Sequence, residues 1–160
     1  MRKYIFIFLI LIGGCTKPFE FITQEARGDI IYVARPPSGS DSNPGTITRP
    51  FRTLNAAFNA ASAGDTIYIR GGTYSYSEIG LTVLSNKNGT ALNPIKIFNY
   101  PGEHPVFNYV DYVATTTTRA LRIDNCDYIH IKGLEIKNLR QGATGTNNGI
   151  YIGASSNNNI

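Results

Sequence analysis

The sequence is poor in the residues that build disulfide-linked or zinc-bound folds. Its 160 residues include two cysteines, Cys15 and Cys126, two histidines and no tryptophan. The histidines, His104 and His130, stand far apart, and no Cys/His group has the spacing of zinc ligands. Cys15 falls in the targeting segment described below, which leaves Cys126 without an intrachain disulfide partner in the mature chain. The sequence therefore indicates neither a disulfide scaffold nor a zinc-binding fold.

Strong charge is also lacking. The chain has 15 basic and 11 acidic residues and a net charge of +4. Loss of Arg2 and Lys3 with the signal peptide predicted below would leave 13 basic residues against 11 acidic ones, a net charge of about +2. A charge this small does not argue by itself for an acidic polymer as partner, and we expect no nucleic-acid partner.

The N-terminus has the pattern of a targeting segment. Arg2 and Lys3 form a basic region, and residues 4–12 form an apolar stretch too short to span a bilayer as a helix. Ile12-Gly13-Gly14-Cys15 follows, and it resembles the bacterial lipobox, in which the cysteine is lipidated and becomes the first mature residue. The alternative is an ordinary signal peptide that happens to contain a cysteine.

We expect Cys15 to carry a lipid that anchors the protein in the bacterial cell envelope. The anchor would lie in the outer membrane or at the cell surface, facing the periplasm or the exterior. Residues 1–14 are then the signal peptide, residues 15–28 a tether, and residues 29–160 a single domain, which we expect to be a monomer.

Short strands with an apolar-polar-apolar centre recur along residues 29–160. Strands this short cannot bury a face alone, so they must stack on copies of themselves, as in a solenoid. In each strand the two aliphatic residues point inward and the central residue faces solvent. Together with the helix described below, the predicted inward residues are Leu54, Phe58, Ile67, Ile69, Ile95, Ile97, Leu121, Ile123, Ile129, Ile131, Ile150 and Ile152.

The repeat is about 29 residues long, because Leu121-Arg122-Ile123 recurs as Ile150-Tyr151-Ile152. Two to three such coils fit in the chain. The sequence stops inside a turn, with an open last coil, so we expect it to be the N-terminal part of a longer protein. Strands are predicted near residues 31–34, 66–70, 80–84, 95–99, 105–108, 119–124, 128–132, 134–138 and 149–153.

One amphipathic helix is predicted over residues 53–62. Phe51, Leu54, Phe58 and Ala61 form a single apolar stripe, and Thr53 is a suitable N-cap. Such a helix would seal the first coil of a solenoid core, and Gly64 stands where a glycine often ends a helix. Without the downstream strands, a surface helix of an α+β domain would explain the pattern as well.

Four segments together resemble the N-terminal cap of right-handed parallel β-helix proteins. They are Tyr32-Val33-Ala34, residues 39–46 (GSDSNPGT), residues 49–54 (RPFRTL) and residues 64–74 (GDTIYIRGGTY). The likeness is greatest to the pectate lyases of polysaccharide lyase family 9, and chondroitinase B and alginate lyases have a similar opening. The resemblance implies an all-β, right-handed parallel β-helix with an N-terminal capping helix.

The resemblance also implies an activity, β-elimination on an acidic polysaccharide such as pectate. In those lyases an aspartate cluster on the middle coils binds Ca²⁺ and a lysine abstracts the proton at C5 of a uronic acid. Those coils would lie beyond Ile160, so no catalytic residue and no metal ligand is assigned in this sequence, and the chain alone is expected to be inactive. A non-catalytic β-helix, serving as an adhesin or glycan-binding surface lipoprotein, is the alternative.

Two residues are candidates for substrate binding. Arg122 and Tyr151 occupy equivalent central positions of consecutive coils, so they should be neighbours on one outer face. An aromatic ring can cover the apolar side of a pyranose while a guanidinium pairs with its carboxylate. An ordinary solvated sheet face explains them equally well.

The turns of the predicted solenoid contain further polar residues. Asp124 and Asp127 supply too few oxygen ligands for a calcium site and fit turn-capping roles. Asn125, Asn138 and residues 157–159 are predicted to stack as a ladder of amides within the turns.

Overall fold

The computed structural model describes residues 28–114, 116–141, 145–153 and 156. The predicted signal peptide and Cys15 lie outside these ranges. The elements are β1 (Ile30–Val33), α1 (Leu54–Ala60), β2 (Thr66–Ile69), β3 (Gly72–Ser75), α2 (Tyr76–Ile79), β4 (Thr82–Ser85), β5 (Ile95–Asn99), β6 (Pro105–Asn108), β7 (Thr118–Asp124), β8 (Ile129–Lys132), β9 (Glu135–Lys137) and β10 (Asn147–Ile152). In this part of the chain no helix is long and apolar enough to cross a membrane.

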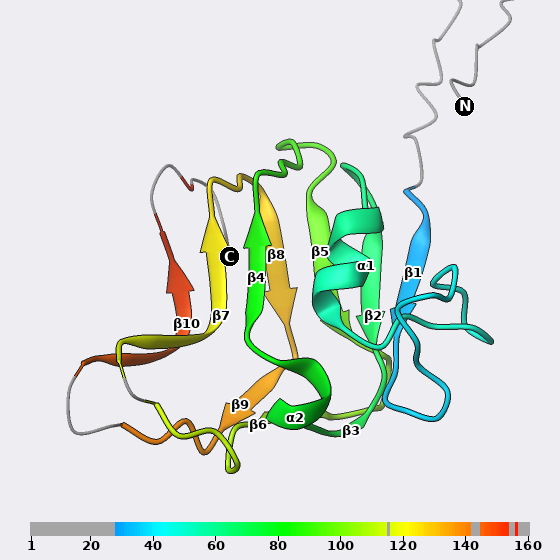
Figure 1. Cartoon of the computed structure of the whole chain (residues 1–160). Helices are drawn as coiled ribbons and strands as arrows, with labels where there is room; N and C mark the ends of the chain where they lie inside the picture. Colours follow the sequence, from blue (N-terminus) through cyan, green and yellow to red (C-terminus); the bar gives the residue numbers. More distant parts are fainter. Residues whose placement is uncertain (1–27, 115, 142–144, 154–155, 157–160) are drawn as a thin grey trace, which may run out of the picture.

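The strands form three parallel sheets around one core (Figure 1). Their orders are β1-β2-β5-β8, β10-β7-β4 and β3-β6-β9. Successive coils are in register, since Ile67 pairs with Ile97 and Ile97 with Ile131. The predicted parallel β-helix is thereby confirmed. The predicted number of coils was too low, because the first sheet has four strands and the chain makes about four turns.

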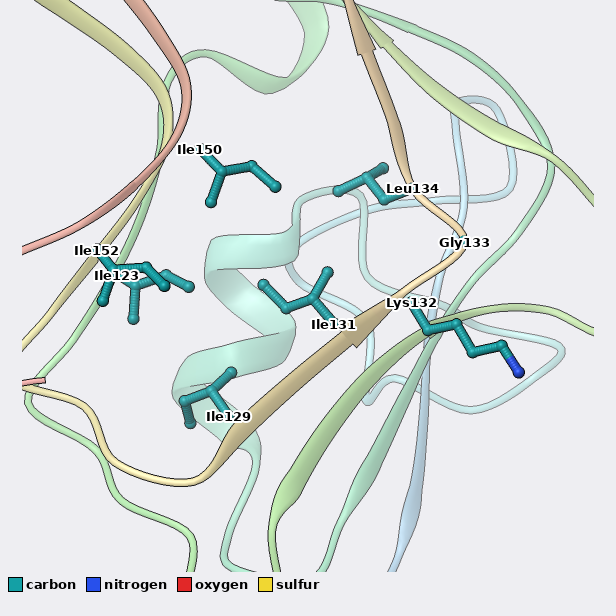
Figure 2. A pocket seen from close by; sticks show the side chains of 8 residues that line it. All are labelled: Ile123, Ile129, Ile131, Lys132, Gly133, Leu134, Ile150 and Ile152. Atoms are coloured by element: carbon teal, nitrogen blue, oxygen red, sulfur yellow. The ribbon is translucent and has the colours of Figure 1, made fainter. Parts of the chain in front are cut away.

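Inward and outward residues alternate as predicted through most of the core. Nine of the twelve predicted inward residues are at most 2 % exposed. Ile131 is partly buried, whereas Ile150 and Ile152 are 49 % and 50 % exposed. These two side chains do point inward (Figure 2), but they line an apolar pocket of about 270 Å³ that none of the described residues covers.

Helix α1 takes the place beside β4 where the β10-β7-β4 sheet would have its next strand (Figure 1). Its apolar side buries Leu54, Ala57 and Phe58 against the first coils. The amide of Asn55 meets the edge of β4, donating from Nδ2 to Leu81 O at 3.4 Å and accepting from Val83 N at 2.9 Å. The helix therefore closes the core and pairs with a strand edge that would otherwise be open.

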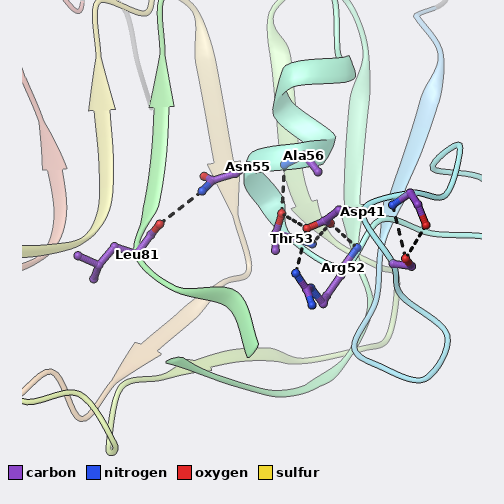
Figure 3. A network of polar contacts seen from close by, with 8 residues as sticks. Asp41, Arg52, Thr53, Asn55, Ala56 and Leu81 are labelled. Carbon is purple, nitrogen blue, oxygen red and sulfur yellow. Dashed lines mark hydrogen bonds and ion pairs between the residues drawn. The ribbon is translucent and has the colours of Figure 1, made fainter. Parts of the chain in front are cut away.

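The start of α1 is fixed by side chains. Thr53 Oγ1 accepts from Ala56 N at 3.2 Å, which confirms Thr53 as the N-cap. The Asp41 carboxylate accepts from the backbone N–H groups of Arg52 and Thr53 at 2.9 and 2.8 Å (Figure 3). These bonds tie the long loop after β1 to the helix.

The end of α1 differs from the prediction. The helix stops at Ala60, and Ala61 is already extended, so Gly64 does not act as its C-terminal glycine. Instead, the Lys87 ammonium donates to the carbonyls of Asn59 and Ala61 at 2.7 and 2.6 Å. A cation from a neighbouring coil thus satisfies the last carbonyls of the helix.

Asparagines do stack within the turns, but in two separate places. Asn125 donates to the amide oxygen of Asn86 at 2.9 Å, and Asn138 donates to that of Asn108 at 2.8 Å. Asn86, Asn125 and Asn138 all have positive φ, which asparagine tolerates better than most residues. The single ladder predicted from Asn125 to Asn138 was wrong, because the two residues lie in turns after different sheets; residues 157–159 lie outside the described part.

Replacement of Phe58 by Asp should abolish soluble expression. The ring is 1 % exposed, so its removal costs about 3–5 kcal/mol, and a buried unpaired carboxylate adds several kcal/mol more. Asn59→Asp, on the exposed side of the same helix, is the matched control. The measurement is the soluble yield and the thermal midpoint of both variants, and a Phe58→Asp protein with the midpoint of the wild type would contradict the closing role of α1.

Candidate functional site

The candidate site lies on the outer side of the β10-β7-β4 sheet. Tyr151 in β10 pairs with Arg122 in β7, and Arg122 pairs with Val83 in β4. The two residues singled out from the sequence are thus opposite each other on neighbouring strands. We call this surface, with Arg119 and the residues around it, the arginine face.

The guanidinium that stacks on Tyr151 comes from Arg119 and not from Arg122. Arg119 Cζ lies 3.8 Å from the centre of the Tyr151 ring. Arg122 instead pairs through Nε with the Asp124 carboxylate of its own strand. Arg122 and Tyr151 are neighbours on one face, as predicted, but the guanidinium over the ring is that of Arg119. The ion pair gives Asp124 a partner in addition to its place beside a turn.

The cause is a break in the alternation of β7. Ala120 and Leu121 are adjacent in sequence, and both are buried. Residues on either side of them therefore leave the core with the same orientation, so Arg119 and Arg122 both reach the outer side. The adjacent apolar residues Ala120 and Leu121 were the feature of the sequence that could have placed Arg119 on the outer side. Strict alternation of inward and outward residues does not allow for such a break, so it misses Arg119.

Arg119 and Arg122 border a pocket of about 230 Å³. Its lining is mixed: it includes the hydroxyl-bearing residues Tyr112 and Thr116–Thr118, and also Leu81 and Val83. Arg119 Nε is buried without a hydrogen-bond partner, as is Asn147 Oδ1. A buried guanidinium N–H that lacks a partner costs about 1–3 kcal/mol. Because Nε itself is buried, a ligand in the pocket would meet the other atoms of the Arg119 side chain.

Tyrosines pack against residues that line this pocket and hold them in place. Tyr112 packs edge-on against Tyr76 with ring centres 4.6 Å apart, and its hydroxyl is 3.0 Å from Thr118 Oγ1. Tyr109 donates to Ala120 O at 3.0 Å. Burial raises the pKa of the Tyr109 hydroxyl to about 12, so this group stays protonated and serves as a structural donor.

The arginine face has the chemistry of a binding surface. A guanidinium offers paired donors to a carboxylate, and a tyrosine ring offers an apolar face to a sugar. Within the described ranges, no three His, Cys, Asp or Glu side chains lie close enough together to hold a metal ion. The described residues therefore do not fit a calcium site, and no general base is assigned among them.

The fold places the chain among right-handed parallel β-helix proteins. Residues 31–160 match the family model described as the Pel9A-like right-handed β-helix region. The chain belongs to this family.

Known proteins with similar chains include lyases. Pectate lyase L of Paenibacillus polymyxa (strain SC2) is 40 % identical over 84 % of this chain and 27 % of its own length. YwoF of Bacillus subtilis (strain 168) is 36 % identical over 98 % of this chain and 33 % of its own. A solved rhamnogalacturonan lyase superposes with a TM-score of 0.65 at 29 % identity, over 82 % of this chain and 34 % of the other. The chain spans about a third or less of each of these proteins.

Arg119→Gln should weaken binding of polygalacturonate, a polymer that carries carboxylates on pyranose rings. Loss of one charge-assisted contact is expected to raise the dissociation constant about tenfold. Arg49→Gln, an exposed arginine in the loop before α1, removes the same charge elsewhere and should leave the dissociation constant unchanged. The measurement is isothermal titration of the full-length protein with polygalacturonate, and equal dissociation constants for wild type and Arg119→Gln would remove Arg119 from the binding surface.

Proposed function

We propose that this chain forms the N-terminal coils of a secreted or surface-anchored polysaccharide lyase that cleaves an acidic polysaccharide such as pectate by β-elimination. The match of residues 31–160 to the Pel9A-like β-helix family carries the proposal. Similarity to a pectate lyase and to a rhamnogalacturonan lyase supports an acidic, uronate-containing substrate. The arginine face supports the same substrate class, because Arg119 and Tyr151 suit a carboxylate on a pyranose.

The described coils would contribute the end of the structure and part of the substrate contact. In this proposal the catalytic base and the calcium ligands lie outside the described residues. When bound, Ca²⁺ would neutralise the uronate carboxylate and so acidify the neighbouring C–H group. Within the described coils, Arg119 and Arg122 would hold the polymer by its carboxylates.

The test is the ultraviolet absorbance of the unsaturated uronide that β-elimination produces. Full-length protein with polygalacturonate should form this product with calcium and lose the activity in a chelator. Residues 15–160 expressed alone should give none. They should also be unstable or aggregate, because half-exposed Ile150 and Ile152 leave one end of the core open.

Two outcomes would contradict this proposal in different ways. Calcium-dependent turnover by residues 15–160 would move the catalytic groups onto the arginine face. Full-length protein that binds polygalacturonate and rhamnogalacturonan but forms no unsaturated product from either would favour a non-catalytic glycan-binding protein.

Lipid attachment at Cys15 is the second part of the proposal. The lipobox-like Ile12-Gly13-Gly14-Cys15 supports it. Cells fed a clickable fatty acid should label the wild-type protein, which should partition with the envelope, whereas Cys15→Ser should lose both properties. Cys126→Ser is the matched control, because Cys126 is a buried residue of the domain. Equal labelling of wild type and Cys15→Ser would rule out the anchor.

A further inference from the structure

The outer side of the β1-β2-β5-β8 sheet carries aromatic and basic side chains that do not contribute to the core. Its outward residues form two rows in register across the four strands. One row is Tyr32, Tyr68, Phe98 and Lys132, and the other is Ile30, Thr66, Lys96 and His130. We call this surface the tyrosine face.

The rings of this face form one connected group. Tyr32 and Tyr68 have ring centres 6.2 Å apart, and Tyr100, just beyond β5, lies 6.2 Å from Tyr32 and 5.8 Å from Tyr68. All of these rings, and that of Phe98, are partly exposed. The inner side of the sheet is already filled by Ile67, Ile69, Ile95 and Ile97, each at most 1 % exposed.

The charges on the tyrosine face are of one sign. Lys96 and exposed Lys132 carry the positive charge, His130 lies in the same row as Lys96, and neither row contains a carboxylate. At the edge, Arg70 lies over the Tyr100 ring at 4.7 Å and is held by Glu103, whose Oε1 and Oε2 accept from Arg70 Nε at 3.0 and 2.9 Å. Glu103 also accepts from Gly71 N, so this acidic group beside the rings is already paired.

From this arrangement we infer that the tyrosine face is a second binding surface for an acidic polysaccharide, separate from the arginine face. Strands lie about 4.8 Å apart, so a sugar chain that crosses them would meet Tyr32, Tyr68, Phe98 and Lys132 in turn. Rings stack on the apolar sides of pyranoses, and ammonium groups pair with carboxylates. The assignment rests on these residues and does not require the proposed lyase activity.

The test measures affinity for polygalacturonate in a chelator, using full-length protein and isothermal titration. The double variant Lys96→Gln/Lys132→Gln should bind about tenfold more weakly than the wild type, with a smaller dependence on salt. Lys137→Gln is the matched control, since Lys137 is an exposed lysine in β9, on another sheet. Tyr68→Leu should also weaken binding, whereas Tyr68→Phe, which keeps the ring, should restore it.

Further comparisons separate this surface from the arginine face and from a general charge effect. The same relative loss is expected in an Arg119→Gln background, because the two faces lie on different sheets. Unchanged affinity in Lys96→Gln/Lys132→Gln, or an equal loss in Lys137→Gln, would overturn the inference. Equal binding of fully methyl-esterified polygalacturonate would also overturn it. Absence of lyase product would refute the proposed function. The affinities of wild type, Lys96→Gln/Lys132→Gln and Lys137→Gln would still decide whether the tyrosine face binds the polysaccharide.

Discussion

The structure depends on one aliphatic core that runs through all of its coils. The described strands, three to seven residues long, are too short to bury a face alone. Ile67, Ile97 and their equivalents are therefore buried by the coil on either side. Each coil is stable only in register with its neighbours. The first coil needs another cover, and α1 provides it. The helix covers the core with Leu54 and Phe58, and the Asn55 amide forms hydrogen bonds with the edge of β4. At the opposite end none of the described residues covers Ile150 and Ile152, which are 49 % and 50 % exposed.

The same register that builds the core arranges the outer side chains in lines. In-register parallel strands put equivalent positions side by side at about 4.8 Å, so residues that recur in sequence gather into extended surfaces. On the β10-β7-β4 sheet this brings Arg119, Arg122 and Tyr151 together. On the β1-β2-β5-β8 sheet it brings rings and ammonium groups together. A solenoid is therefore well suited to a long polymer, which can contact equivalent groups on several coils.

The candidate site was only partly accessible to sequence reasoning. Strict alternation correctly places Tyr151 opposite Arg122, because both are central residues of recurring triplets. It does not find Arg119, because buried Ala120 and Leu121 interrupt the alternation and turn Arg119 outward. The asparagines in the turns show that a local pattern also fails to identify a residue's partner in another coil. Each asparagine is recognisable as a turn residue, but its stacking partner belongs to the preceding coil of the same turn, Asn86 for Asn125 and Asn108 for Asn138.

By itself, the sequence determined the strand rhythm, the capping helix with its Thr53 N-cap, a solenoid of stacked short strands and most of the inward residues. These follow from patterns within a few residues, such as alternation, helical spacing and turn chemistry. The parallel β-helix class was implied by the resemblance of residues 32–74 to known N-terminal caps. The tertiary structure alone decided that Lys87 satisfies the last carbonyls of the helix, that Arg119 stacks on Tyr151 and that the tyrosines of three coils form one face. Those contacts join residues of different strands and coils, and their geometry depends on where each turn ends and how each side chain leaves the sheet, which no local pattern specifies.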